Sequence, residues 1–291
     1  MSTDLDPRAA AAAREAVKAH DENFPVAFRL LPREQREAMN AVYAFCRATD
    51  DIGDEGEAGP EERLARLDAW QAAVDDAFAG RPVDDFRLRA LGAAAARHDL
   101  PLDPFHRLIE ANRMDQRRGR WATYDDLLVY CRHSATPVGE MVLAVLGYRD
   151  EWRIGMSDDT CIALQLINFW QDIARDLADR DRVYLPIEDM ERFGVVEADL
   201  RAETATPEVR ELVAFEVDRA RELFHRGAPL ARFVPARARL DIRMFTAGGL
   251  ALCDAIADID HDTLARRPAP GARGRARIAG RALLGLARGA A

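Results

Sequence analysis

Several signatures of well-known enzyme and metal-binding classes are absent from this 291-residue sequence. Its four cysteines are widely spaced and form no C-x-x-C pair, which argues against a zinc ribbon or a dithiol redox motif and favours buried cysteines in a reducing compartment. The six histidines show no H-E-x-x-H spacing, and neither G-x-S-x-G nor a strand-borne G-x-G-x-x-G occurs. No stretch reaches the roughly 18 apolar residues of a membrane span, and the first residues lack the apolar core of a secretory signal. We therefore expect a cytoplasmic protein that is neither a zinc protease nor a serine hydrolase.

An excess of positive charge is missing as well. The formal net charge is -9 and the isoelectric point is near 5.3, which argues against a general nucleic-acid binder with a basic face. The acidity alone names no partner. With 48% hydrophobic residues, a chain of this length can bury a full core, and we expect one large domain.

Alternating apolar and polar runs, which are typical of strands, are nearly absent, whereas alanine, leucine, arginine and glutamate dominate. The sequence therefore predicts an all-α fold, a single-domain bundle of helices around a central cavity. The predicted helices that matter for function are Arg33 to Gly53, Tyr124 to Leu146, Ser157 to Leu177 and Pro235 to His261. We predict an N-terminal extension over 1–19, the helical domain over 20–262 and a basic tail over 263–291.

An aspartate pair lies near the end of the first of these helices. Asp50 and Asp54 are four residues apart, which places both carboxylates on one helix face, where they can share a hard cation. Tyr43 and Arg47 fall on the same narrow stripe, while apolar residues wrap most of the remaining circumference. Buried carboxylates need partners, so we expect this stripe to face a metal, a counter-charge or a wet cavity. An ordinary solvated helix face is the alternative.

A second aspartate pair, Asp172 and Asp176, repeats this spacing far downstream. Gln165 and Asn168 continue the same line at intervals of three and four residues, within an otherwise apolar segment. A surface helix more often carries lysine, arginine or glutamate at such positions. An ordinary exposed surface is the alternative, because Gln171, Arg175 and Asp179 widen the polar arc. Magnesium usually keeps several waters and is held by one or two carboxylates plus substrate phosphates, so two facing aspartate helices suggest a diphosphate held between them.

These motifs resemble those of a known family. The two aspartate pairs, together with Tyr130-Cys131 and the run from Arg182 through Tyr184 to Pro186, resemble the squalene/phytoene synthase family of head-to-head prenyl transferases. The resemblance covers roughly His20 to His261. Three runs are similar to the bacterial hydroxysqualene synthase branch of hopanoid biosynthesis, which acts without a reductant: Glu22 to Ala27, Asp50 to Glu55 and Asn168 to Asp172.

The resemblance implies an isoprenoid synthase-like fold and the conversion of presqualene diphosphate and water to hydroxysqualene and diphosphate, with Mg²⁺ and without NADPH. It places Mg²⁺ on Asp50, Asp54, Asn168, Asp172 and Asp176. It implies diphosphate or substrate contacts for Tyr43, Arg47, Gln165, Arg182 and Tyr184. Aromatic faces can stabilise a migrating carbocation, which makes Phe24, Phe45 and Phe169 candidates for the apolar wall. Plain core packing is the alternative for each of these three.

Two positions depart from the wider family pattern. Gln171 stands where most relatives carry an arginine that would grip diphosphate, so one positive charge is missing there. His133 stands where the family usually has a second aromatic residue, and Ala135-Thr136-Pro137 replaces a small Ala-Gly pair. We predict that His133 or a neighbouring polar group orients the attacking water, because a titratable ring replaces a tyrosine beside the expected reacting carbons. A hydrogen bond within the core is the alternative.

The tail after His261 carries arginines interleaved with leucines and almost no acid. This pattern is typical either of peripheral docking on an anionic membrane face or of a disordered, solvated tail. Two further readings of the whole chain stay open. The same site can condense two farnesyl or geranylgeranyl diphosphates, as presqualene diphosphate, squalene or phytoene synthases do. The second alternative is a helical assembly factor or scaffold that has lost catalytic activity. Such a protein would be expected to have lost the aspartates, yet all four are present.

Overall fold

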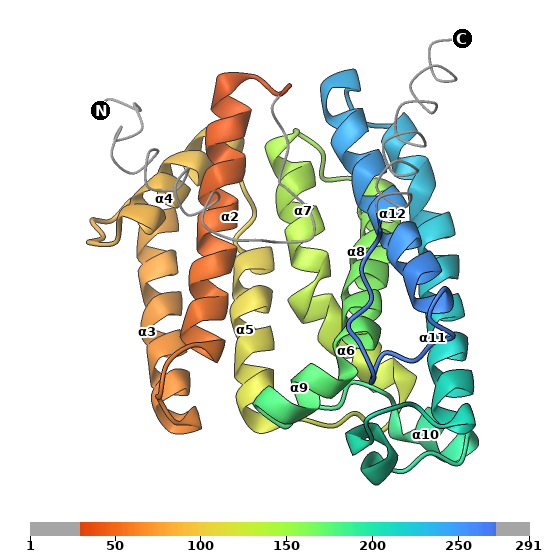
Figure 1. Ribbon diagram of the computed structural model, residues 1–291. Helices are drawn as coiled ribbons and strands as arrows, with labels where there is room; N and C mark the ends of the chain where they lie inside the picture. Colours follow the sequence, from red (N-terminus) through yellow and green to blue (C-terminus); the bar gives the residue numbers. More distant parts are fainter. Residues whose placement is uncertain (1–29, 272–291) are drawn as a thin grey trace. The chain divides into compact units, whose positions relative to one another are not determined.

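The computed structural model describes residues 30–271, and these residues are almost entirely helical (Figure 1). Within them no strand occurs, and the only β-type pairing is an isolated bridge that joins Arg120 and Val183. The all-α prediction is confirmed. The chain divides into two compact units, each built from two stretches of sequence: one includes 30–117 and 136–154, the other 118–135 and the residues from 155 onward.

The first unit contains four long helices and one short helix. They are α2 (Arg33–Asp54), α3 (Pro60–Phe78), α4 (Phe86–His98), α5 (Asp103–Arg117) and α7 (Thr136–Val145). Helix α2 packs against α3, α4, α5 and α7, so most of its circumference is buried, as the apolar pattern of its sequence predicts. Because it is held on several sides, α2 is a rigid support for the polar residues at its C-terminal end.

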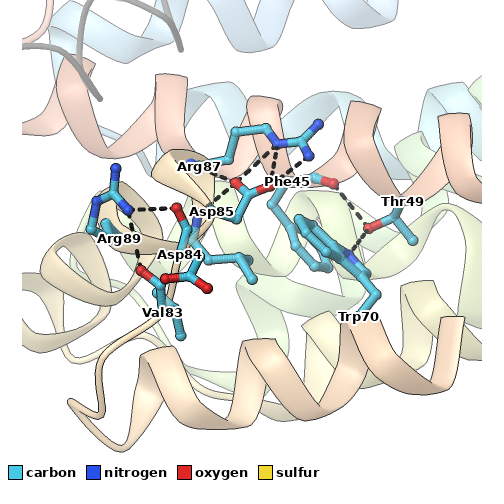
Figure 2. A network of polar contacts seen from close by, with 9 residues as sticks. Phe45, Thr49, Trp70, Val83, Asp84, Asp85, Arg87 and Arg89 are labelled. Carbon is cyan, nitrogen blue, oxygen red and sulfur yellow. Dashed lines mark hydrogen bonds and ion pairs between the residues drawn. The ribbon is translucent and has the colours of Figure 1, made fainter. Parts of the chain in front are cut away.

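A polar network fixes the packing around the middle of α2 (Figure 2). The Thr49 hydroxyl donates to the Phe45 carbonyl at 2.9 Å, and the Trp70 indole of α3 donates to the same hydroxyl at 3.0 Å. Asp85 caps α4 by accepting from the backbone N–H of Arg87 at 2.7 Å, and it also forms an ion pair with the Arg87 guanidinium. Buried polar groups stabilise a fold when they are paired. The hydrogen bond from Trp70 to Thr49 therefore ties α3 to α2, while Asp85 stabilises the start of α4.

The second unit contains α6 (Tyr124–Ser134), most of α8 (Glu151–Gln171), α9 (Ile173–Arg180), α10 (Ile187–Arg192), α11 (Pro207–Gly227) and α12 (Ala236–Ala257). Two short 3-10 helices, η1 (Glu197–Arg201) and η2 (Ala228–Arg232), complete it. Two of these helices begin at N-cap residues that favour a helix start. Thr123 caps α6 by accepting from the Asp126 N–H, and Thr206 caps α11 with Pro207 at the first helical position.

Two predicted helices are interrupted, and on this point the prediction was wrong. The stretch from Tyr124 to Leu146 breaks at Ala135, and Pro137 then falls in the first turn of α7, where a missing N–H is tolerated. The stretch from Ser157 to Leu177 breaks at Asp172, whose ψ of 17° is far from the helical value. Asp172 is therefore the N-cap residue of α9, and Asp176 lies in the first turn of that helix.

Candidate active site

The first carboxylate pair lies at the C-terminal end of α2, as predicted. Asp50 and Asp54 are both on this one helix, four residues apart. The Asp50 side chain is exposed to solvent, but many protein atoms surround its carboxyl group at longer range. The resulting loss of hydration raises the pKa of Asp50 to about 7. A hydrogen bond from Asn112 opposes the shift, whereas the negative charge of Asp54 adds to it. A carboxylate in this environment is stabilised by a cation.

Helix α5 supports this end of α2 through two amides that sequence reasoning missed. The Asn112 amide donates to the Asp50 carboxylate at 3.4 Å and to the Leu108 carbonyl at 3.2 Å. Gln116 donates to the Gly53 carbonyl at 3.0 Å. A Cβ on Gly53 would stand 2.0 Å from Asn112 Oδ1, so any larger residue at this position would force the Asn112 side chain to move. The i, i+4 spacing of Asn112 and Gln116 was the available signal, but such pairs occur on many helices.

Three other predicted residues of α2 have well-defined surroundings. Arg47 forms ion pairs with Asp51 at 2.9 Å and with Glu55 at 2.7 Å. Tyr43 is half-buried on α2. Phe45 is fully buried, stacks on Trp70 and makes an edge contact with Phe105. The structure therefore gives Phe45 a role in core packing, and its contact with substrate stays a prediction.

The second carboxylate pair lies at the junction of α8 and α9. Asn168 is in the last turn of α8, Asp172 is at the break, and Asp176 is buried in α9. The backbone stays connected across the break, because the Asp172 N–H donates to the carbonyls of Asn168 and Phe169, and the Asp176 N–H donates to the Asp172 carbonyl at 2.8 Å. The predicted residues are thus brought together, although not on one continuous helix.

Electrostatics and an orphaned acceptor indicate a cation-binding character for this second set. Burial raises the pKa of Asp176 to about 6, the charge of Asp172 raises it further, and Arg180 opposes the shift. The Asn168 side-chain oxygen is buried and accepts no hydrogen bond from residues 30–271. Buried polar atoms are nearly always satisfied, so an unsatisfied oxygen beside two carboxylates fits a hard cation that prefers oxygen ligands.

Arg267, which lies 95 residues further along the chain, contacts Asp172. Its Nε and Nη2 donate to the two Asp172 carboxylate oxygens at 2.5 and 2.9 Å, and Nη2 also donates to Gln171 Oε1 at 2.9 Å. Gln171 is buried and donates in turn to the Pro268 carbonyl at 2.5 Å. The positive charge that the sequence lacks at position 171 is therefore supplied beside it by Arg267. Sequence reasoning assigned Arg267 only to the basic tail.

An aromatic cluster adjoins this second set. Phe169 stacks on Tyr184 with ring centroids 3.6 Å apart, and Tyr130 lies within 6.2 Å of both rings. Trp121 contacts Tyr130 at 4.7 Å. The predicted residues Phe169 and Tyr184 are therefore neighbours, and Arg182, two residues before Tyr184, is buried.

The loop that carries Arg182 and Tyr184 is held by a turn before α6. The Val183 N–H donates to the Gly119 carbonyl at 2.9 Å, and Arg120 forms ion pairs with Asp181 and Glu197. A Cβ on Gly119 would lie 2.9 Å from the Asp181 carbonyl oxygen, so the close approach requires glycine. These contacts fix the backbone on which two predicted site residues stand.

The remaining predicted residues are placed as follows. His133 Nδ1 lies 2.9 Å from the Val129 carbonyl, so in the neutral ring Nδ1 is the donor and Nε2 is left as an acceptor. Gln165 is half-buried on α8, one turn before Asn168. Phe24 lies outside the described residues, as do the 1–19 extension and the tail beyond 271.

Comparison with known proteins decides the family. The profile of squalene/phytoene synthase matches residues 17–276, nearly the whole chain. The chain belongs to the squalene/phytoene synthase family. A 15-cis-phytoene synthase from Synechococcus elongatus is 34% identical over 226 residues, which cover 74% of this chain and 72% of that protein. A phytoene synthase from Thermus thermophilus is 34% identical over 257 residues, covering 86% and 84% of the two chains.

Solved structures agree with this membership. The crystal structure of squalene synthase HpnC from Alicyclobacillus acidocaldarius matches with a TM-score of 0.81 and 43% identity, covering 87% of this chain and 95% of that chain. A dehydrosqualene synthase in complex with ligand matches with a TM-score of 0.87 over 97% of each chain, and at 23% identity this likeness concerns the fold alone. Membership of the squalene/phytoene synthase family makes this chain a prenyl diphosphate-processing enzyme. It shares the all-α fold of its relatives.

Among residues 30–271 of this chain, no three or more histidine, cysteine, aspartate or glutamate side chains lie close enough together to hold a metal ion by themselves. Each set offers two aspartates, and the second adds the Asn168 oxygen. This donor set fits magnesium, which takes one or two carboxylates and completes its shell with water and substrate phosphates. In the part of the chain that the structure describes, no helix is long and apolar enough to cross a membrane.

Proposed function

We propose that this protein is a magnesium-dependent hydroxysqualene synthase, which converts presqualene diphosphate and water to hydroxysqualene and diphosphate without NADPH. The observation that carries the proposal is the 43% identity, over 87% of this chain, with the squalene synthase HpnC from Alicyclobacillus acidocaldarius. Identity with the curated phytoene synthases is lower, 31–35%. The comparison thus favours a C30 over a C40 substrate, and the residue runs similar to the hydroxysqualene branch favour water as the nucleophile.

In the proposal, both carboxylate sets serve the same reaction. Asp50, Asp54, Asn168, Asp172 and Asp176 hold Mg²⁺, which when bound supplies Lewis-acid neutralisation of the diphosphate leaving group. The raised pKa values of Asp50 and Asp176 support this assignment, since a bound cation would stabilise the ionised form of both carboxyls. Arg47 and Tyr43 add a guanidinium and a phenol on the α2 stripe, and Gln165 and Arg182 are assigned contacts with the diphosphate or the substrate.

The same proposal gives the aromatic cluster and His133 distinct tasks. The faces of Phe169 and Tyr184 stabilise the carbocation left when diphosphate departs, and their burial keeps stray nucleophiles away. His133 holds the attacking water. The Nδ1 contact with the Val129 carbonyl leaves Nε2 of the neutral ring free to accept the proton that the water loses as its oxygen bonds to carbon.

The proposed membrane contact is peripheral. We place the protein in the cytoplasm, with the basic 263–291 tail on the inner face of the cell membrane, where a water-insoluble C30 product can be delivered. This part of the proposal rests on the sequence of the tail, most of which lies outside the described residues.

A second candidate function is condensation of two prenyl diphosphates, because the curated relatives are phytoene synthases. Product analysis separates the two. Purified protein with Mg²⁺ receives presqualene diphosphate, farnesyl diphosphate or geranylgeranyl diphosphate, each with and without NADPH. We expect hydroxysqualene from presqualene diphosphate only, with no effect of NADPH. Consumption of either shorter diphosphate would instead make the protein a condensing synthase, and inertness in every reaction would favour a scaffold.

Site assignment is tested by matched aspartate variants. Asp50→Ala and Asp172→Ala should each abolish turnover and leave a folded helical protein, because they remove metal oxygens rather than core volume. Asp179→Ala is the matched control, since Asp179 lies on α9 near Asp176 but is exposed, and the described part of the chain gives it an ion pair with Arg175 at 3.6 Å. Near-normal turnover of Asp50→Ala or Asp172→Ala would show that the metal assignment is wrong.

A further inference from the structure

Three arginines, Arg232, Arg239 and Arg243, lie around the start of α12, and within residues 30–271 no ion pair is formed by any of them. Arg232 ends η2, and Arg239 and Arg243 lie four residues apart in the first two turns of α12, so they share one helix face. The part of the chain that the structure describes gives none of the three an ion pair, although arginines elsewhere in it form many. The fold therefore holds three positive charges close together where η2 ends and α12 begins.

Two hydrogen-bond donors of this cluster are buried and unused. Arg239 Nε and Arg243 Nη1 are shielded from solvent and have no acceptor among the described residues. Buried donors are nearly always satisfied in folded proteins, and a charged donor left without a partner is especially costly. The missing acceptor is consequently expected to come from a bound molecule.

The surroundings of the cluster add to its positive potential. Burial is the largest cause that holds the pKa of Arg243 below its usual value, and the positive charges of Arg239 and Arg232 lower it further. Asp241 lies between them in sequence, but burial raises its pKa to about 6 and no guanidinium lowers it. The first turn of α12 contains no acid, and its N-cap, Pro235, provides no side-chain cap. The positive end of the helix dipole thus points at a group of cations.

We propose that Arg232, Arg239 and Arg243 form a binding site for a phosphate group at the start of α12. Guanidinium groups bind phosphate through paired, charge-assisted hydrogen bonds, and helix N-termini favour the same anions. A phosphate at this corner accepts from Arg239 Nε and Arg243 Nη1 and neutralises the mutual repulsion of the three arginines.

This phosphate site is separate from the carboxylate site of the same unit. Helix α12 continues for 14 residues beyond Arg243, about 21 Å, and ends at Ala257, before the segment whose Arg267 holds Asp172 (Figure 1). The proposal therefore stands whether or not the hydroxysqualene reaction is confirmed. The phosphate could belong to free inorganic phosphate or diphosphate, or to the headgroup of an anionic lipid, and the experiment distinguishes these sources.

The test uses the full-length protein with a chelator, so that divalent cations do not recruit diphosphate to the aspartates. One arm titrates phosphate and diphosphate by calorimetry. The other measures co-flotation with phosphatidylglycerol vesicles, with phosphatidylcholine vesicles as the neutral reference. Arg239→Gln and Arg243→Gln are compared with Arg237→Gln, a matched control on the same helix, because Arg237 is exposed and is not among the charges that depress the pKa of Arg243.

We expect Arg239→Gln and Arg243→Gln each to weaken binding at least about tenfold, as loss of a charged hydrogen bond does, while Arg237→Gln changes little. An effect in the calorimetric arm identifies a free anion, and an effect only with phosphatidylglycerol vesicles identifies a lipid headgroup. The Tm in low-anion buffer should stay the same or rise, because like charges are separated. Equal behaviour of all three variants in both arms, or a fall in Tm without any loss of anion binding, would overturn the proposal.

Discussion

Gly53 offers a direct test of how α5 supports the first carboxylate pair. An added Cβ in Gly53→Ala would stand 2.0 Å from Asn112 Oδ1 and 2.9 Å from its Cγ, well inside contact distance. The Asn112 side chain cannot swing away freely, because its amide donates to the Leu108 carbonyl at 3.2 Å and to Asp50 at 3.4 Å. Relief of the clash therefore disturbs the contact that holds Asp50.

The expected cost follows from overpacking a buried contact, about 1–3 kcal/mol. For a chain of this size each kcal/mol corresponds to a fall in Tm of about 2–4 °C, so we expect a decrease of about 2–12 °C by differential scanning calorimetry. Turnover should fall as well, because Asp50 loses the hydrogen bond from Asn112. Gly155→Ala is the control: nothing lies within 4 Å of its added Cβ, and replacing a helical glycine should raise stability by up to about 1 kcal/mol.

A double variant makes the reasoning refutable. Asn112→Ala removes the Oδ1 and Cγ atoms that Gly53→Ala would strike, so the two changes together should cost clearly less than the sum of their separate effects. Additive effects on Tm, or a Gly53→Ala protein as stable and active as the wild type, would show that the contact with Asn112 is not what requires glycine at this position.

Three further predictions concern other parts of the molecule. Arg267→Gln removes the guanidinium from both Asp172 oxygens, so Mg²⁺ should raise the Tm of this variant more than that of the wild type; an equal or smaller Mg²⁺ effect would argue against Asp172 as a metal ligand. Glu216 is buried, and burial raises its pKa from 4.5 to about 8, with Arg219 opposing and Asp189 adding to the shift. Its protonated form is therefore favoured in the fold, and the associated stability is complete below about pH 4.5 and is lost as the pH rises through about 8. Denaturant titrations should show that the free-energy difference between wild type and Glu216→Gln changes over this window by on the order of a few kcal/mol, and a pH-independent difference would contradict the assignment. His133→Ala should slow turnover or change the ratio of alcohol to hydrocarbon products, and the water-positioning role is untenable if turnover and product ratio are both unaltered.

The sequence was sufficient to predict the parts of the site that depend on local periodicity. Helix α2 carries Tyr43, Arg47, Asp50 and Asp54 as its pattern indicates, because most of its circumference is buried by neighbouring helices. The line from Asn168 through Asp172 to Asp176 was predicted as well, since it is encoded within nine residues. These features need no knowledge of distant contacts.

Other features depend on contacts that no local pattern encodes. The break at Asp172 contains neither glycine nor proline, and the ion pair with Arg267 forms across 95 residues. The fit of Gly53 against Asn112 likewise depends on how α2 and α5 pack. Glycine near the end of a helix would ordinarily be interpreted as a terminator, so its role in close packing was not visible.

The central claim is that water captures the carbocation formed from presqualene diphosphate, and oxygen labelling tests it most directly. Purified protein with Mg²⁺ is given presqualene diphosphate in H₂¹⁸O, without NADPH, and the products are analysed by mass spectrometry. The account predicts hydroxysqualene with one ¹⁸O atom in its hydroxyl group and unlabelled diphosphate, because the carbon–oxygen bond of the substrate is the bond that breaks. An unlabelled alcohol, which would indicate cleavage at phosphorus, or no product without NADPH, would contradict it.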